Sequence, residues 1–465
     1  MIVVTGGVAQ GWVAMETFLG RREFLASSAA FAASTGLPVA GRPAQGKWYR
    51  GNLHMHTLLS DGQAFPEEAA LLYKRFGYDF VVFSDHNKVH EDGNVWVNAK
   101  NRKSLKPGNV DNFRKHFPER KIETCTSADG TVSYRLKTFD EVSAELNDPG
   151  RFLVVSGCEY HNVEESGHAL HCNGINTRTG RRHKKMASCA ESLKNILSEH
   201  EAANPPSKAK TLFTVNHPFW YHYDIDPMFL AENPEVRFFE IANAISPPTF
   251  GMMEGAWSPD RFWDIVLAHR ASRGAPLLYA VATDDTHDYS RLYREFEGVK
   301  NPIRKCHVRV RAKELSADSL IDAMNAGDFY ASNGVEFNDI RFDGSSGTLH
   351  VDVKQQPGKR IVIRFYGTKK GFDATIGAGK QYRLEELAAQ KGKVLPKWAE
   401  GKTRTIRTFS DDIGVVLKEV KGTKASYTLQ KDDLYVRAKA FVLTKPGNED
   451  TIPHYTDVAW TQPCR

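Results

Sequence analysis

The segment RGNLHMHTLLSDG, residues 50–62, decides how the chain is interpreted. It starts as a short apolar strand and ends in two histidines one residue apart, His54 and His56, with Asp61 five positions later. Alternate side chains of a strand share one face. The two imidazoles are therefore expected on the same side, where both can bind one metal ion, and Asp61 is close enough to fold back over them.

From Trp48 to about Asn333, short apolar segments alternate with helical patterns. Several of the apolar segments are continuous, which is typical of strands covered on both faces in a parallel sheet. About seven such units predict an α/β fold related to the (β/α) barrel, with the insertion 88–145 forming loops over one face. The expected strands are 50–56, 78–86, 151–160, 168–176, 211–219, 236–244 and 276–285, and helices are expected at 66–77, 189–202, 261–272 and within 316–334.

After Gly334 the pattern changes to period-two strands separated by Gly, Pro and Asp turns. This pattern predicts a small antiparallel β-sandwich. We therefore expect a barrel domain at 47–333 and a sandwich-like accessory domain at 334–465. Packing of this second domain on the barrel is favoured over carbohydrate binding or a membrane-facing role.

The N-terminal segment LGRREFLASSAAFAASTGLPVAG, residues 19–41, has two adjacent arginines followed by a mild apolar run. It resembles a twin-arginine export signal. The run is too short and too weakly apolar for a comfortable transmembrane helix, although a membrane anchor and a disordered tail are the alternatives. We expect residues 1–46 to be a signal and linker, and the protein to be exported to the periplasm or the extracellular space.

Charge and cysteine content exclude some functions. The 465 residues include 62 Lys and Arg against 56 Asp and Glu, and no dense basic block indicates nucleic-acid binding. The six cysteines contain no CxxC pair, which excludes a zinc ribbon, while disulfides remain open for an exported protein.

Side chains that can bind metals recur where the expected strands end. In barrels of parallel strands, the carboxyl ends converge on one mouth, which carries the active site. Residues far apart in sequence are therefore expected to meet there. The candidates are His54, His56, Asp61, Asp85, His86, Glu159, His217, Asp285 and His287.

The types of these side chains indicate the metal chemistry. Imidazole with carboxylate, and no thiolate, suits Zn, Mn or Fe at a hydrolytic centre. The candidates are too many for one ion with four to six ligands, so two or three divalent ions are implied. A carboxylate such as Glu159 would bridge a pair of them.

The order of these motifs resembles the polymerase and histidinol phosphatase (PHP) family of metallohydrolases. The matching elements are His54-Met55-His56, Ser60-Asp61-Gly62, Ser84-Asp85-His86, Glu159 with a histidine about a dozen residues later, His217-Pro218 and Asp285-Thr286-His287. The resemblance covers roughly residues 48–333. It implies a distorted (β/α)7 TIM-like barrel that holds up to three metal ions and hydrolyses phosphate esters.

The resemblance also implies a ligand set for each ion. One ion would be held by His54, His56, Glu159 and Asp285, a second by Asp61, His86 and His287, and a third by Glu159, His171 and His217. His171 is favoured over His168, and Asp285 over Asp284, because they fit the motifs better. Asp85 is expected to orient a neighbouring ligand rather than bind metal.

These observations predict a metal-dependent hydrolase, most simply a phosphomonoesterase or phosphodiesterase in which a water activated between two ions attacks phosphorus. The expected partner is a small anionic phosphate ester. An exported PHP branch that includes carbaryl hydrolases suggests an alternative, a carboxylic or carbamate ester substrate. A non-catalytic metal-binding domain is the third possibility. The expected catalytic residues are His54, His56, Asp61, His86, Glu159, Asp285 and His287.

Overall fold

The computed structural model describes residues 46–220, 225–244, 257–296, 306–390, 397, 400–443 and 457–465. The chain divides into two units, Met1–Val39 and Ala40–Arg465, and the description below concerns the second. The expected export signal lies outside the described residues. Within the described ranges, no helix has the length and apolar character needed to cross a membrane. All six cysteines lie in these ranges, and none of them forms a disulfide there.

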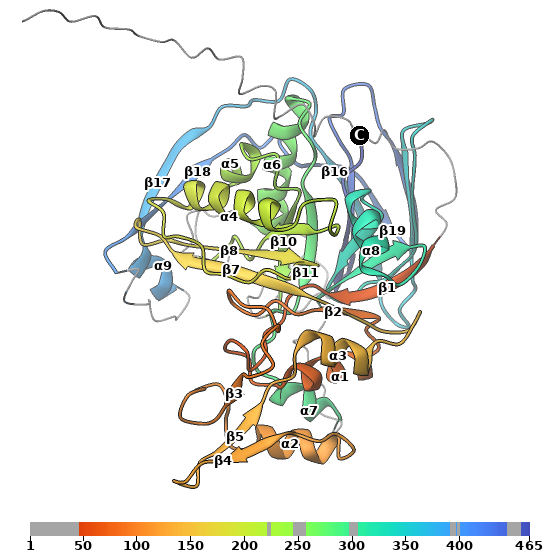
Figure 1. The fold of residues 1–465 in the computed structure, drawn as a ribbon. Helices are drawn as coiled ribbons and strands as arrows, with labels where there is room; N and C mark the ends of the chain where they lie inside the picture. The colour runs from red at the N-terminus through yellow and green to blue at the C-terminus, as the bar shows by residue number, and fades with distance from the viewer. Residues whose placement is uncertain are drawn as a thin grey trace, which may run out of the picture. The chain divides into compact units, whose positions relative to one another are not determined.

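The protein has a mixed α/β fold with several sheets (Figure 1). The largest sheet has nine strands in the order β19 (Val415–Lys421), β16 (Ile361–Gly367), β21 (Arg437–Val442), β22 (Val458–Thr461), β13 (Phe329–Ser332), β12 (His307–Ala312), β1 (Lys47–Asn52), β2 (Phe80–Val82) and β6 (Leu153–Val155). A second sheet has five strands in the order β11 (Tyr279–Thr283), β10 (Phe238–Asn243), β9 (Leu212–Val215), β8 (Ala169–Ile175) and β7 (Gly157–Val163).

Strand β8 corrects the expectation of an all-parallel arrangement. It pairs antiparallel with β7, with Glu159 opposite Asn173, and antiparallel with β9, with Cys172 opposite Val215. Only residues 164–168 connect β7 to β8, and a parallel connection needs a crossover of a dozen or more residues. The chain therefore turns back as a hairpin at this point.

The strands expected to form the barrel are divided between the nine-stranded and the five-stranded sheet, and the described residues form no closed barrel. The sheets meet at two isolated parallel bridges, one between Met55 and Thr286 and one between His86 and Glu159. Both bridges lie beside or within the histidine motifs. The first bridge joins the segments that follow β1 and β11, and the second places the segment that follows β2 beside β7.

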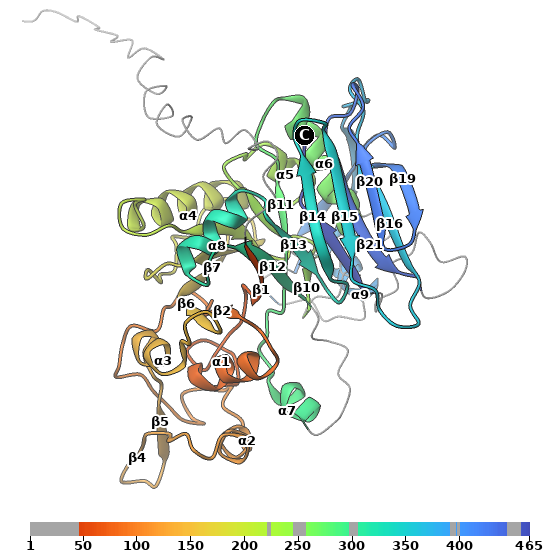
Figure 2. The ribbon, with the colours of Figure 1, turned by 90° about the vertical axis from the view of Figure 1, so that its right-hand side faces the viewer.

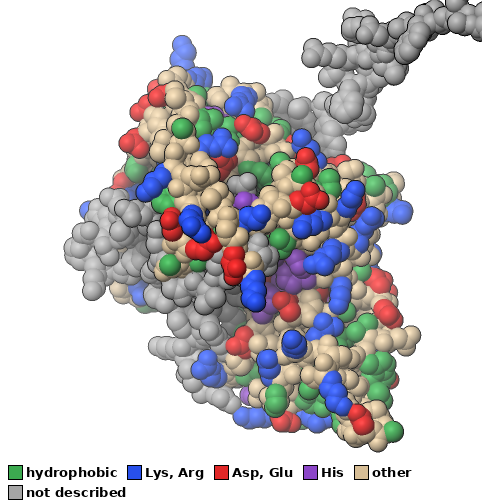
Figure 3. Space-filling model, turned by 90° about the vertical axis from the view of Figure 1, so that its left-hand side faces the viewer, with side chains coloured by type: hydrophobic (Ala, Val, Ile, Leu, Met, Phe, Trp, Pro, Cys, Tyr) green, Lys and Arg blue, Asp and Glu red, His purple; other side chains and the backbone are tan. Residues whose placement is uncertain are grey.

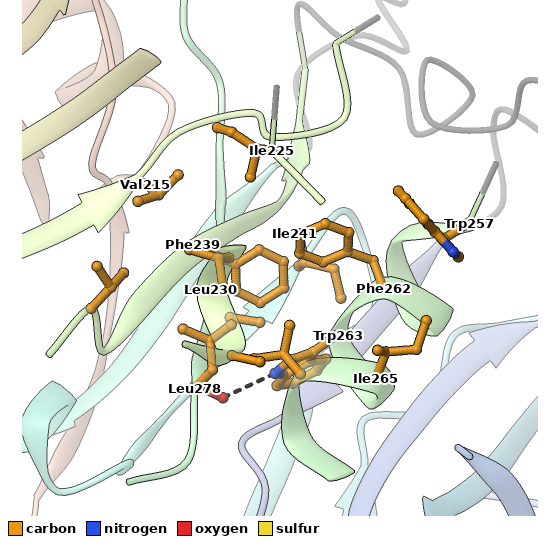
Figure 4. Close-up of a cluster of buried hydrophobic side chains, with 14 of the residues drawn as sticks. Val215, Ile225, Leu230, Phe239, Ile241, Trp257, Phe262, Trp263, Ile265 and Leu278 are labelled. Atoms are coloured by element: carbon orange, nitrogen blue, oxygen red, sulfur yellow. Dashed lines mark hydrogen bonds between the residues drawn. The ribbon is translucent and has the colours of Figure 1, made fainter. Parts of the chain in front are cut away.

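Helices α4 (Cys189–Ala203), α5 (Pro227–Ala231) and α6 (Pro259–Ser272) begin at side-chain caps. The Ser258 hydroxyl, for example, accepts a hydrogen bond from the backbone N–H of Arg261, which satisfies a donor in the first turn of α6. The core beside α6 combines aromatic and aliphatic residues (Figure 4). At its centre the indole N–H of Trp263 donates to the carbonyl of Leu278 at 2.9 Å.

The insertion 88–145 is more ordered than the loops expected there. It contains α2 (Asn109–His116), α3 (Phe139–Leu146) and a small sheet in the order β3 (Trp96–Val97), β5 (Val132–Arg135), β4 (Thr124–Thr126). With α1 (Pro66–Arg75) and α7 (Ser290–Phe296), these elements lie on one side of the large sheets (Figures 1 and 2). A shared apolar core holds this group together.

The C-terminal strands extend the sheet that contains β1, with helix α8 (Ala317–Asn325) between β12 and β13. Strands β14 (Phe337–Asp343), β15 (Thr348–Val353) and β20 (Lys424–Thr428) form a three-stranded sheet. Its apolar side chains share a core with those of β16, β21 and β22. A further hairpin consists of β17 (Gly377–Arg383) and β18 (Thr403–Thr408), with α9 (Leu384–Gln390) between them. A separate sandwich and the domain boundary near 333 remain predictions.

The carboxyl group of Glu68 introduces a pH dependence into the fold. It is buried in the first turn of α1 and accepts hydrogen bonds from the backbone N–H of Phe65, at 2.9 Å, and from the Tyr293 hydroxyl. Burial raises the pKa of Glu68 to about 8, against about 4.3 in an unfolded chain. The folded protein therefore keeps a proton that the unfolded chain loses above about pH 4.3. This contribution to stability is complete below that pH and is lost as the pH rises through about 8.

We expect metal-free wild-type protein to unfold at a lower urea concentration near pH 9 than near pH 6. In Glu68→Gln, the difference in urea midpoint between the two pH values should be smaller. The glutamine keeps the shape and cannot ionise. Urea titrations of both proteins in the presence of a chelator measure the effect. An unchanged difference in the variant would show that Glu68 does not carry it.

Candidate metal centre

The nine side chains expected to bind metal lie together in the structure. Their donor atoms form four overlapping groups in which all atoms are within 4.8 Å of one another. The groups are His56, Asp61, His86 and His287; His54, Glu159 and His217; His54, His56 and Asp285; and His86, Glu159 and His171. On one face of the molecule, histidine side chains gather between Lys and Arg side chains (Figure 3).

The most buried group is a triangle of His54, His56 and Asp285. The Nε2 atoms of the two histidines are 3.1 Å apart, and Asp285 Oδ1 lies 3.2 Å from the first and 3.1 Å from the second. Ligand atoms about 2.1 Å from a shared ion are about 3.0–3.4 Å from one another. Asp285 Oδ1 is buried and accepts no hydrogen bond from the described residues. The triangle therefore fits a divalent cation.

Glu159 connects the groups. Its carboxylate oxygens lie 3.3 Å from His54 Nε2, 2.9 Å from His86 Nδ1, 3.1 Å from His171 Nδ1 and 3.3 Å from His217 Nε2. Burial alone would raise the pKa of Glu159, but the surrounding imidazoles outweigh burial and hold this pKa well below its usual range. A charged carboxylate among imidazoles from several strands is the arrangement expected of a bridging ligand.

Asp61 and His287 form the outer part of the site. Asp61 Oδ1 lies 3.3 Å from His287 Nε2, and Asp61 Oδ2 lies 3.7 Å from His86 Nε2. The other ring nitrogen of His287 is 3.0 Å from the carbonyl oxygen of Asp285, to which it can donate. Burial opposes protonation of His287, but Asp61 and Asp285 raise its pKa to about 9. Because the Asp61 side chain is 56% exposed, this part of the site is open to solvent.

Glu240 contacts two of the clustered histidines, although the sequence motifs do not include it. Its Oε1 lies 2.7 Å from His54 Nδ1 and accepts from the Thr283 hydroxyl at 2.6 Å. Its Oε2 accepts from the backbone N–H of His217 at 2.9 Å. A carboxylate on Nδ1 fixes the histidine tautomer and presents the Nε2 lone pair to a metal. The signal was a glutamate inside the apolar run VRFFEIANA, residues 236–244.

Two buried amides hold the ligand carboxylates in place. Asn216 Nδ2 donates to Glu159 Oε1 at 2.8 Å, and Asn243 Nδ2 donates to Asp285 Oδ2 at 3.1 Å. Asn243 leaves Asp285 Oδ1 facing His54 and His56. The Glu159 oxygen that Asn216 contacts, Oε1, also faces imidazoles, with His171 Nδ1 at 3.1 Å. Asn243 lies near the end of the expected strand 236–244, and the sequence favoured a surface position for it over a place in the pocket.

Asp85 organises the loop after His56. It accepts from the backbone N–H and the hydroxyl of Thr57, both at 2.8 Å, and from the Ser60 hydroxyl at 2.5 Å. His90 Nε2 lies 2.6 Å from Asp85 Oδ2. Among the described residues, Asp85 is in none of the four groups of possible metal ligands given above, which we call the metal-type groups. It positions the segment that carries Asp61, which agrees with an orienting role.

The backbone is strained at two of the ligand positions. Asp285 has φ 48° and His217 has φ 26°, in a region that non-glycine residues rarely adopt. The backbone N–H of Asp285 donates to the carbonyl of His54 at 2.9 Å, which holds this conformation. Such strain concentrates at functional sites, where the surroundings enforce it.

In two pairs of nearby residues, His168 with His171 and Asp284 with Asp285, the geometry shows which residue faces the site. His171 is in a metal-type group, whereas His168 Nε2 lies 3.0 Å from the carbonyl of Thr403. Asp285 is in a group, whereas Asp284 accepts from the hydroxyls of Tyr73, at 3.1 Å, and Tyr78, at 3.2 Å. The preferred residue is the one that faces the site in both pairs.

The groups overlap with the expected ligand sets without reproducing them. Asp61, His86 and His287 fall in one group, with His56 added. His171 and His217 both approach Glu159, but they belong to separate groups. The roles of these residues as ligands, and their division among individual ions, remain predictions.

Glu240→Gln should weaken metal binding about 10- to 100-fold, because the amide no longer enforces the His54 tautomer. Asp284→Asn is the matched control: it removes a neighbouring buried carboxylate that faces Tyr73 and Tyr78, and it should leave metal affinity unchanged. Competition with a coloured chelator measures both affinities. Equal affinities in the two variants would exclude this role for Glu240.

Comparisons with known proteins give no family assignment. No family model and no curated protein matches the chain. Among solved structures, it is similar to a two-domain protein from Bacteroides vulgatus containing a predicted PHP-like metal-dependent phosphoesterase, at 14% identity over 84% of this chain and 98% of that chain, with a TM-score of 0.39. A proposed metal-dependent phosphoesterase from Bifidobacterium adolescentis is 13% identical over 53% of this chain and 90% of that chain, with a TM-score of 0.27. An amidohydrolase from Chromobacterium violaceum, solved with sulfate and no metal, is 13% identical over 53% and 96%, with a TM-score of 0.25.

Proposed function

We propose that the protein is a metal-dependent hydrolase of the PHP type that cleaves phosphate esters. The observation that carries this proposal is that six histidines and three carboxylates, the buried Glu159 among them, lie in four overlapping groups of possible metal ligands. The two sheets, joined at the bridges Met55–Thr286 and His86–Glu159, would then correspond to an opened form of the distorted (β/α)7 barrel.

The donor set suits two or three Mn, Zn or Fe ions, because it contains imidazole and carboxylate without thiolate. When bound, such ions lower the pKa of water and neutralise charge that develops on substrate oxygens. The chain itself fixes the ligands. Glu240 orients His54, Asn216 and Asn243 orient Glu159 and Asp285, and Asp85 holds the loop before Asp61.

Cationic side chains beside the site favour an anionic substrate. Lys88 Nζ donates to the carbonyl of Leu59 at 3.1 Å, and Arg102 Nη1 donates to the carbonyl of Ser60 at 2.7 Å. Burial and the nearby Arg102 lower the pKa of Lys88. Each cation retains further N–H donors near the loop that carries Asp61, and a phosphate group bound by them would relieve the repulsion between the two cations.

Reconstitution tests the proposal. Protein stripped with a chelator and reloaded separately with Mn, Zn or Fe should hydrolyse a phosphomonoester or a phosphodiester of p-nitrophenol, and the double variant His54→Ala/His56→Ala should not. An aryl carbamate is assayed in parallel. Loaded protein that cleaves the carbamate and neither phosphate ester would replace the proposed substrate class, and loaded protein inactive on all three would support a binding role.

We also propose that the chain is exported through the twin-arginine-type segment at 19–41. The support is the Arg21-Arg22 pair followed by a weakly apolar run. Arg21→Lys/Arg22→Lys should leave the protein in the cytoplasmic fraction of an exporting host. The same distribution for wild type and variant would reject export by this route.

A further inference from the structure

His161 is an additional imidazole at the site with no place in its metal-type groups. It lies on β7 two residues after Glu159, and its side chain is half-buried. Its ring centroid is 4.2 Å from that of His86 and 4.9 Å from that of His171. His86 and His171 share a group with Glu159, whereas His161 is in none of the groups formed by described residues. The ring therefore borders the centre without belonging to its donor set.

Two hydrogen bonds to the backbone of His161 fix the orientation of the Asn87 side-chain amide. The backbone N–H of His161 donates to Asn87 Oδ1 at 3.0 Å, and Asn87 Nδ2 donates to the carbonyl of His161 at 3.1 Å. A backbone N–H can only donate and a carbonyl can only accept, so these two bonds determine which end of the amide is nitrogen. Asn87 holds this pose with a left-handed backbone, φ 55°, and its N–H donates to the carbonyl of Glu159 at 2.8 Å.

The same amide nitrogen fixes the tautomer of the imidazole. Asn87 Nδ2 is 3.0 Å from His161 Nδ1. Because Nδ2 carries only protons to give, Nδ1 must accept, and the proton of the neutral ring must be on Nε2. Among the described residues, the ring of His161 forms its hydrogen bond through Nδ1, and Nε2 forms none. The ring thus presents an N–H donor beside His86 and His171.

We propose that His161 is a substrate-binding catalytic residue whose Nε2–H donates a hydrogen bond to a non-bridging oxygen of the phosphoryl group, with Asn87 as the positioning residue that sets the tautomer. This inference rests on the proposed phosphoesterase function. A neutral imidazole that already accepts at Nδ1 stabilises charge without transferring a proton. It complements the ions because charge grows on the phosphoryl oxygens during hydrolysis.

The tautomer can be measured without any substrate. In zinc-loaded, ¹⁵N-histidine-labelled protein, long-range ¹H–¹⁵N spectra should show His161 protonated at Nε2 only, with His161→Gln used to assign the signal. Inorganic phosphate should then shift that Nε2–H resonance. In Asn87→Asp the carboxylate can only accept, so the proton should move to Nδ1 and the response to phosphate should be lost.

Kinetics on matched variants test the role in the reaction. His161→Gln places an amide near the position of Nε2, whereas His161→Asn places it near Nδ1. We expect His161→Asn and Asn87→Asp to lose about 10²-fold in kcat, and His161→Gln to retain at least about tenfold more activity than His161→Asn, with metal content unchanged in all three. Across aryl phosphates of differing leaving group, the loss should be constant.

Each outcome decides one claim. An Nδ1–H tautomer, equal activities of the Gln and Asn variants, a loss that grows with poorer leaving groups, or lost metal would each overturn the role of His161. If wild-type protein hydrolyses no phosphate ester, the proposed function fails instead. The phosphate titration then still shows whether His161 binds phosphoryl oxygens.

Discussion

Glu159→Gln should lose most of its bound metal and about 10³-fold or more of its hydrolytic activity, since the metal ions supply several kcal/mol of transition-state stabilisation. The glutamine has nearly the same size but no negative charge. It would leave His54, His86, His171 and His217 around a neutral amide whose nitrogen repels a cation. Elemental analysis of the purified variant and initial rates with a phosphate ester measure the two losses.

Glu164→Gln is the matched control for this variant. Glu164 is also a buried glutamate beside a histidine, with His183 Nε2 at 3.1 Å and the Ser192 hydroxyl donating at 2.7 Å. It is in none of the metal-type groups found among the described residues. We expect this variant to lose stability while keeping its metal content and kcat. Full metal occupancy in Glu159→Gln would remove the bridging role assigned to Glu159.

Arg437→Met should destabilise the protein by about 3–5 kcal/mol, because it leaves the buried carboxylate of Asp264 without its cation. Arg437 on β21 is fully buried, and its Nε donates to Asp264 Oδ1 at 2.8 Å while Nη2 lies 2.5 Å from Asp264 Oδ2. Asp260, also on α6, receives Arg437 Nη1 at 3.1 Å and Lys439 Nζ at 2.7 Å. Urea unfolding of the variant and wild type gives the difference.

Two further variants separate burial from charge. Arg178→Met removes an exposed arginine paired with Glu91 and Asp140, and it should cost less than about 1 kcal/mol. Arg437→Met/Asp264→Leu removes both partners of the buried pair and should recover part of the stability. A loss for Arg437→Met no larger than that for Arg178→Met would mean that water solvates the buried acids.

The clustered histidines and carboxylates could be found from the sequence because their spacing has direct geometric meaning. His54 and His56 follow β1, which ends at Asn52, and Asp285 and His287 follow β11, so the strand pattern alone predicted that they lie near one mouth. Glu240 could not be identified in this way. A single carboxylate in an apolar strand has no partner within its own segment, and its value depends on His54, which lies far away in the sequence.

Strand direction and sheet membership were also beyond the sequence pattern. The apolar run at 168–176 has the composition of a buried strand in either direction, and only the five-residue connection 164–168 indicates a hairpin. The period-two strands after 334 predicted antiparallel pairing. They did not show that β22 would pair with β13 in the sheet containing β1. The partner of such a strand depends on which other strands still have an unpaired edge once the remaining elements have packed.

The nine-stranded sheet joins segments that are very distant along the chain. Lys47 lies opposite Ala312, and Tyr330 lies opposite Thr461. Forming such pairs requires large loops to close, which costs chain entropy before the hydrogen bonds between the strands form. Refolding from denaturant should therefore be slow. Until β12 arrives, β1 has an open edge that other chains can occupy, and concentrated refolding mixtures should therefore aggregate in competition with native assembly.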